Sequence, residues 1–154
     1  MAALVLALAI LFFAVFSPAA AMDRRPSAEA RARVEHHVRA VNDIQRHFRE
    51  VLDGRCPRFP SAGEWEQYFD SEVDRVVLLV AHVEQAWVEA KMTGDDDVRR
   101  YAKEPRKRLD EARVLLDKLH ACAADNGASF NDMTVWRRIE QDVPRRRAEI
   151  ALPE

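Results

Sequence analysis

The chain has 154 residues, of which 48% are hydrophobic and 32% are charged, so it is long enough for one domain around one core. Its 24 basic and 26 acidic side chains give a formal net charge of -2. This balance excludes the broad positive field of a nucleic-acid-binding protein and the composition of a disordered acidic tail. The charge by itself identifies no partner.

The N-terminal segment has the composition of an export signal. Residues 2–16 form a continuous apolar run, which is short for the roughly 20 residues that cross a bilayer. Pro18 follows the run, and Ala19–Ala21 supplies a small-residue cleavage pattern. We therefore expect a signal peptide over residues 1–21 and a secreted, extracellular domain over residues 22–154, with no stable membrane insertion after cleavage.

An uncleaved membrane anchor is the alternative for this segment. No Lys or Arg precedes the apolar run, whereas Arg24 and Arg25 lie beyond it. For an anchor, that charge distribution would place the domain in the cytosol.

The first helix is predicted over residues 27–53, with Ser27 as its N-cap and Gly54 as its stop signal. Apolar residues recur along it every three or four positions, which predicts one buried stripe. The stripe consists of Val34, Val38, Val41, Ile44, Phe48 and Val51.

The second helix is predicted from Ser61 or Glu64 to Thr93, before Gly94. Its apolar face is wide enough to indicate a central helix that packs on two neighbours. That face carries Trp65, Phe69, Val73, Val76, Val80, Val83 and Trp87, widened by Val77, Leu78 and Leu79.

The third segment is predicted from Asp95 to Asp125. Pro105 lacks a backbone donor, so the helix should either kink there or restart with Pro105 in its first turn, and we expect a short helix followed by a long one. The apolar residues of this segment are Val98, Tyr101, Leu109, Ala112, Leu115, Leu116 and Leu119.

The last helix is predicted to begin near Ser129 or Asn131 and to be interrupted at Pro144, before Arg145–Arg147. Its residues expected to point inward are Phe130, Met133, Trp136, Ile139 and Val143. The links are short, so the fold expected is all-α: an up-down bundle of about four main helices.

This topology brings Cys56, after the first helix, and Cys122, near the end of the third segment, to the same end of the bundle. A disulfide between them is expected in an oxidising compartment and would contribute about 4 kcal/mol in the entropic model. Two free thiols are an alternative. A zinc site built from His47, Cys56, His120 and Cys122 is another, less favoured one because its spacing is irregular.

Sequence signatures of enzymes and cofactor sites are absent. The chain contains no Cys-x-x-Cys-His, no Glu-x-x-His, no glycine-rich phosphate loop and no Gly-x-Ser-x-Gly. We expect no enzymatic activity, no catalytic residue, no metal and no cofactor. His36 and His37 point in different directions on a helix and are expected to be solvated.

Three tryptophans and a basic end remain as candidate contact residues. Trp65, Trp87 and Trp136 lie on apolar stripes and are expected in the core, with Trp65 the most exposed because it follows a loop. The arginines near the C-terminus could bind heparan sulfate or acidic lipid, but such a run is more often a solvated face. They are Arg137, Arg138 and Arg145–Arg147.

Several stretches resemble the type III, or lambda, interferons. Their order is a helix before a cysteine, a loop with Phe59-Pro60 and Trp65, a Leu-rich helix ending at Ala121-Cys122, and a helix with Trp136 and Pro144. The resemblance covers most of residues 22–154. Compared with that family, the sequence lacks the other cysteines and the final helix. A bridge between Cys56 and Cys122 would be unusual for the family.

The resemblance implies a monomeric class II helical cytokine that binds cell-surface receptor chains and induces an antiviral response. The apparent loss of the last helix would impair signalling. Phe59, Pro60 and Trp65 would be receptor contacts. The alternative is an exported or periplasmic helical-bundle binding protein with an unknown partner.

Overall fold

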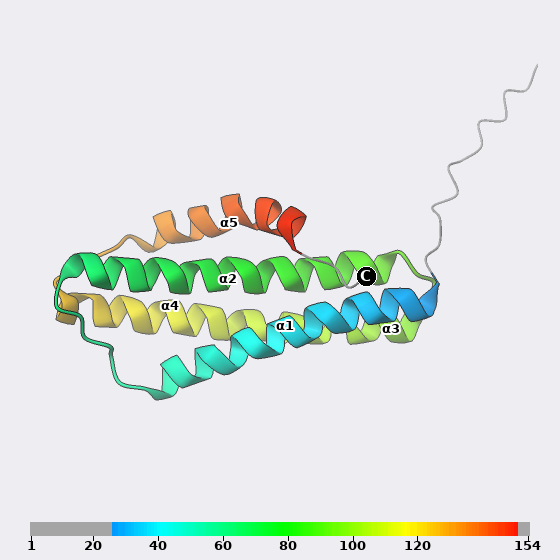
Figure 1. Cartoon of the computed structure of the whole chain (residues 1–154), viewed down its shortest axis with the longest axis horizontal. Coiled ribbons are helices and arrows are strands. Elements are labelled where there is room, and N and C mark those ends of the chain that lie inside the picture. The colour runs from blue at the N-terminus through cyan, green and yellow to red at the C-terminus, as the bar shows by residue number, and fades with distance from the viewer. Residues whose placement is uncertain (1–25, 151–154) are drawn as a thin grey trace, which may run out of the picture.

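The computed structural model describes residues 26–150, which form helices joined by short links (Figure 1). No strand occurs in this range, so the predicted all-α, up-down bundle is confirmed. The predicted signal peptide, residues 1–21, lies outside the described residues. Between residues 26 and 150, no helix combines the length and apolarity needed to cross a membrane. The long helices are α1 (Ser27–Asp53), α2 (Ala62–Lys91), α4 (Leu109–Ala123) and α5 (Asp132–Glu149).

Three short elements complete the described part of the chain: α3 (Asp96–Tyr101) and the 3-10 turns η1 (Glu104–Arg108) and η2 (Ala124–Asn126). Pro105 lies in the first turn of η1, where its missing N–H costs no helical hydrogen bond. The predicted short helix followed by a long one is therefore confirmed. Gly127 follows η2 with a φ of 66°, the left-handed conformation that glycine adopts without strain.

Helix α2 is the centre of the bundle. It packs extensively against α1 and α5 and less extensively against α4, whereas α4 and α5 barely touch each other. Figure 1 shows α5 on one side of α2 and α4 and α1 on the other. The wide apolar face predicted for α2 therefore meets three helices, and the strip between α4 and α5 has no described helix over it.

Two details of the helix ends and faces differ from the prediction. Ser27 is the first residue of α1, which has Pro26 as its N-cap, and its hydroxyl donates to Asp95 instead of capping α1. Met133 was expected to point inward but is 72% exposed. The buried stripe of α5 is Val135, Ile139 and Val143, which recur every four residues.

Pro144 does not interrupt the last helix, contrary to the prediction. It lies on the exposed side of α5, and the helix continues through it to Glu149. The proline removes one backbone hydrogen bond, but Ile139 and Val143 are buried and hold this helix on the bundle.

Two polar pairs lie in the interface between α1 and α2. Nδ1 of His37 is 2.9 Å from Nδ1 of His82, and Nε2 of His47 is 2.9 Å from a carboxylate oxygen of Glu72. The step from His37 to His47 along α1 equals the step from Glu72 to His82 along α2, in the opposite direction. Both pairs therefore belong to one antiparallel register, and a shift of either helix would break both of them.

The expectation that His37 is solvated is wrong. Its side chain is fully buried, and its partner lies on the other helix, 45 positions along the chain. Burial, reinforced by His82, lowers the pKa of His37 to about 3, and burial also lowers the pKa of His82 to about 4. Both rings are therefore neutral at pH 7, so one can donate to the other.

Acid should destabilise this protein through the two histidines. In the unfolded chain they bind protons near pH 6.5, whereas the folded protein resists protonation down to about pH 3–4. The stability that depends on these neutral histidines is thus present above pH 6.5 and is lost as the pH falls below it. Chemical denaturation should show about 2–4 kcal/mol less free energy of unfolding from this pair at pH 5 than at pH 7.5.

The matched variant for this prediction is the double substitution His37→Gln/His82→Gln, which keeps polar side chains but does not titrate. Its free energy of unfolding should depend less steeply on pH between 7.5 and 5. An equal loss of stability in the variant and the native protein would contradict the role assigned to the pair.

Candidate functional site

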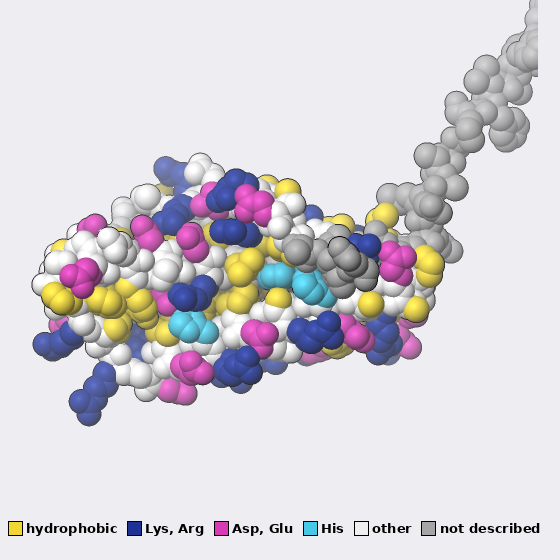
Figure 2. Space-filling view, in the orientation of Figure 1, with side chains coloured by type: hydrophobic (Ala, Val, Ile, Leu, Met, Phe, Trp, Pro, Cys, Tyr) yellow, Lys and Arg dark blue, Asp and Glu magenta, His cyan; other side chains and the backbone are white. Residues whose placement is uncertain are grey.

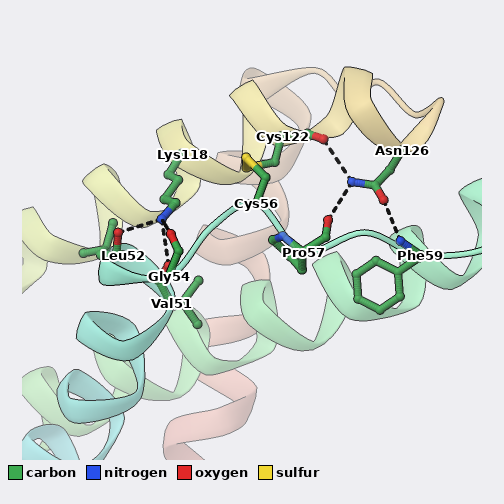
Figure 3. Close-up of a disulfide and its surroundings, with 9 residues drawn as sticks. All are labelled: Val51, Leu52, Gly54, Cys56, Pro57, Phe59, Lys118, Cys122 and Asn126. Carbon is green, nitrogen blue, oxygen red and sulfur yellow. Dashed lines mark hydrogen bonds between the residues drawn. A yellow bond between two sulfur atoms is a disulfide. The ribbon is translucent and has the colours of Figure 1, made fainter.

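The loop between α1 and α2 is fastened to the end of α4. Cys56 in the loop and Cys122 in α4 form a disulfide with their Cα atoms 5.5 Å apart, as topology predicted (Figure 3). No free cysteine remains. The bridge closes a long loop that includes all of α2, so it restricts the unfolded chain and stabilises the bundle.

Two further residues of the same face fasten this loop, and neither was predicted from the sequence. Lys118 donates from Nζ to the carbonyl oxygens of Val51, at 2.9 Å, and of Leu52, at 2.6 Å, so a cation sits at the C-terminus of α1 (Figure 3). Asn126 accepts from the backbone N–H of Phe59 and donates to the carbonyl of Pro57. Their spacing of four residues on either side of Cys122 was the available signal.

Trp65 is not the half-exposed residue that was expected. It is 1% exposed and lies in the core, with its ring 6.1 Å from Phe59 and 5.8 Å from Tyr68. The fastened loop folds over the start of α2 and covers the indole. A side chain without exposed surface cannot be a surface anchor, so Trp65 is removed from the set of contact candidates, while Phe59 is partly buried and Pro60 is exposed.

The four residues considered as a zinc site, His47, Cys56, His120 and Cys122, are bonded to other groups. The two cysteines are bonded to each other, His47 contacts Glu72, and His120 contacts Asp132 through Nδ1 at 2.9 Å. Within residues 26–150, no group of three or more His, Cys, Asp or Glu side chains is arranged to hold a metal ion.

The basic end of α5 is largely neutralised by carboxylates. Arg138 contacts Asp70 and Asp74 of α2, and Arg147 contacts Glu84 of α2. Arg145 and Arg146 both reach a carboxylate within α5. Figure 2 shows the same mixture of basic and acidic side chains over the face in view. The arginine run thus fastens α5 to α2 more than it offers a free positive patch.

A groove runs along α2 between α4 and α5, which we call the Trp87–Trp136 groove. It consists of two adjoining hollows of about 370 and 200 Å³ that share Val80 and Leu109. Its apolar lining comes from α2, α4 and α5. The lining residues are Val76, Val80, Val83, Trp87, Val88, Leu109, Ala112 and Trp136.

Both tryptophans of the groove are partly exposed, although the sequence placed them in the core. Basic side chains gather over them: Nζ of Lys91 is 5.2 Å and Nζ of Lys103 is 5.6 Å from the centre of the Trp87 ring. The guanidinium carbon of Arg106 is 5.4 Å from the same ring, and that of Arg113 is 5.9 Å from the Trp136 ring. Cations over an indole face are held by the ring quadrupole.

None of these four cations has an ion pair with a carboxylate in the described part of the chain, whereas four of the five arginines of α5 do. The four cations come from α2, from the link after α3, from η1 and from α4. Three positive charges share one indole, so they repel one another. An anion placed at this edge would relieve the repulsion, and the apolar floor beside it could accept a hydrophobic side chain.

Comparisons with known proteins do not assign the chain to a family. No protein-family model, curated protein or solved structure matches it. The resemblance to lambda interferons therefore stays a prediction from sequence.

Replacing Trp65 by alanine should destabilise the fold by about 3–5 kcal/mol, because it leaves a large cavity beneath the fastened loop. The matched variant Trp87→Ala should cost less, about 1 kcal/mol, because the Trp87 ring is partly exposed. Guanidinium unfolding measures both. Equal losses, or a Trp65→Ala protein as stable as the native one, would contradict the burial described here.

Replacing Asn126 by alanine should cost about 2–3 kcal/mol, because it leaves the N–H of Phe59 and the carbonyl of Pro57 without their partner. The matched variant Asn131→Ala removes only the N-cap of α5 and should cost about 1 kcal/mol. Urea unfolding of both variants with the disulfide intact checks this order, and the reverse order would contradict it.

Proposed function

We propose that this chain is an exported helical-bundle protein that acts by binding a macromolecular partner in the Trp87–Trp136 groove. The observation that carries the proposal is the combination of an apolar floor with four cations that lack carboxylate partners among residues 26–150. Partly exposed tryptophan and arginine side chains are enriched at binding surfaces. Binding requires no chemical step, so the protein is proposed to be neither an enzyme nor a cofactor carrier.

Export is proposed from two independent features. The apolar run at residues 2–16 and the small residues at Ala19–Ala21 fit a cleaved signal peptide. The disulfide between Cys56 and Cys122 fits an oxidising compartment, where such bonds form and persist.

A secreted cytokine of the lambda interferon type is a narrower proposal. It rests on the sequence resemblance, and the exposed Pro60 with the adjoining Phe59 leaves a small loop surface for cell-surface receptor chains. The burial of Trp65 removes one of its three expected contacts. On this proposal the mature protein would activate a class II receptor reporter, and Phe59→Ala would weaken that response.

Expression of the full chain in a host with a secretory pathway tests export. N-terminal sequencing of the product should give a start at Met22, in the culture medium or periplasm, and thiol titration should find no free thiol. A product that keeps residues 1–21, or that carries two free thiols, would contradict the proposed compartment.

A further inference from the structure

We propose that the occupant of the Trp87–Trp136 groove is an amphipathic helix whose apolar stripe is flanked by Asp or Glu. This inference rests on the proposed function and names the chemistry of its partner. Charge complementarity requires a negatively charged partner. The cations at the edge of the groove have no carboxylate partner among the described residues, whereas most basic side chains of α5 have one.

The dimensions of the groove fit a helix. Its lining follows α2 from Val76 to Lys91, a length of about 22 Å at the helical rise of about 1.5 Å per residue. The groove has one helix as its floor and one on each side, so another helix could pack on the floor, ridges into grooves. A partner of about four turns would place three or four apolar side chains on the floor.

The cations of the groove are placed where they can contact the flanks of such a helix. Arg106 and Arg113 lie on the α4 side of the groove and Lys91 near the end of α2, and all three are exposed. Asp110 and Glu84 also line the groove, but Glu84 is engaged by Arg147. Acidic residues on the partner would therefore meet mostly free cations, whereas basic residues would meet repulsion.

The probe for this inference is a pair of designed helical peptides of about 20 residues, long enough to be partly helical in solution. Both carry Leu at every third or fourth position. One has Glu flanking the Leu stripe, and the other has Lys in place of each Glu. Fluorescence anisotropy of the labelled peptides against the full mature protein should show the Glu peptide binding at least about tenfold more tightly than the Lys peptide.

Substitutions test whether the peptides bind in the groove. Arg106→Glu/Arg113→Glu should weaken binding of the Glu peptide by at least about tenfold and should improve binding of the Lys peptide. Arg39→Glu, an exposed arginine of α1 away from the groove, is the matched control and should leave both affinities unchanged. The milder pair Arg106→Gln/Arg113→Gln should give an intermediate loss, and circular dichroism confirms that each variant is folded.

Different results overturn different parts of the account. Equal binding of the two peptides, or equal effects of the groove and Arg39 variants, would reject the acidic helix. Binding of phosphatidylglycerol vesicles that depends on Arg106 and Arg113, without binding of the Glu peptide, would keep the groove as a binding site but reject this partner. No binding of either peptide or of the vesicles would reject the inference together with the proposed function.

Discussion

The organisation of this protein depends on the need to cover α2. This helix of 30 residues has buried side chains around most of its circumference, and it cannot remain folded in water without neighbours on several sides. Helices α1 and α5 cover most of it, and α4 covers a part. The strip that α4 and α5 leave between them is the Trp87–Trp136 groove. The candidate site is thus one part of α2 that the covering helices leave open; a second hollow, of about 340 Å³, lies on α2 between α1 and α5.

Polar contacts fix the positions of the elements that pack around α2. The pairs His37–His82 and His47–Glu72 share one antiparallel register and oppose sliding of α1 along α2, because buried polar groups are costly without their partners. Beyond the C-terminus of α1, the disulfide and the side chains of Lys118 and Asn126 fasten the first loop to α4. These polar contacts and the disulfide involve none of the residues that line the candidate binding surface, although the floor of that surface includes core residues such as Val76 and Val83.

The sequence was enough to predict the four long helices, the break at Pro105 and the disulfide. Periodicity gives the apolar face of a helix, and short links restrict the order in which helices pack. Neither periodicity nor link length shows which part of that apolar face lacks a neighbouring helix. For this reason the tryptophans were placed in the wrong order: Trp65 is buried by its fastened loop, whereas Trp87 and Trp136 lie where α4 and α5 separate.

The groove itself could not be predicted for a related reason. Lys91, Lys103 and Arg106 belong to different elements and only meet over Trp87 after folding. The arginine run at Arg145–Arg147 is the more conspicuous basic feature of the sequence, yet its charges are paired. Likewise, the environment of His37 depends on a residue of another helix, which local composition does not report.

The indole signals of the three tryptophans test the central claim most directly, namely that the Trp87–Trp136 groove binds an acidic amphipathic helix. Each indole N–H gives its own signal in a ¹H–¹⁵N NMR spectrum of the labelled protein. Addition of the Glu-flanked peptide should shift the signals of Trp87 and Trp136 and leave that of Trp65 in place. A shift confined to Trp65, or no shift of the two groove signals at saturating peptide, would contradict the account.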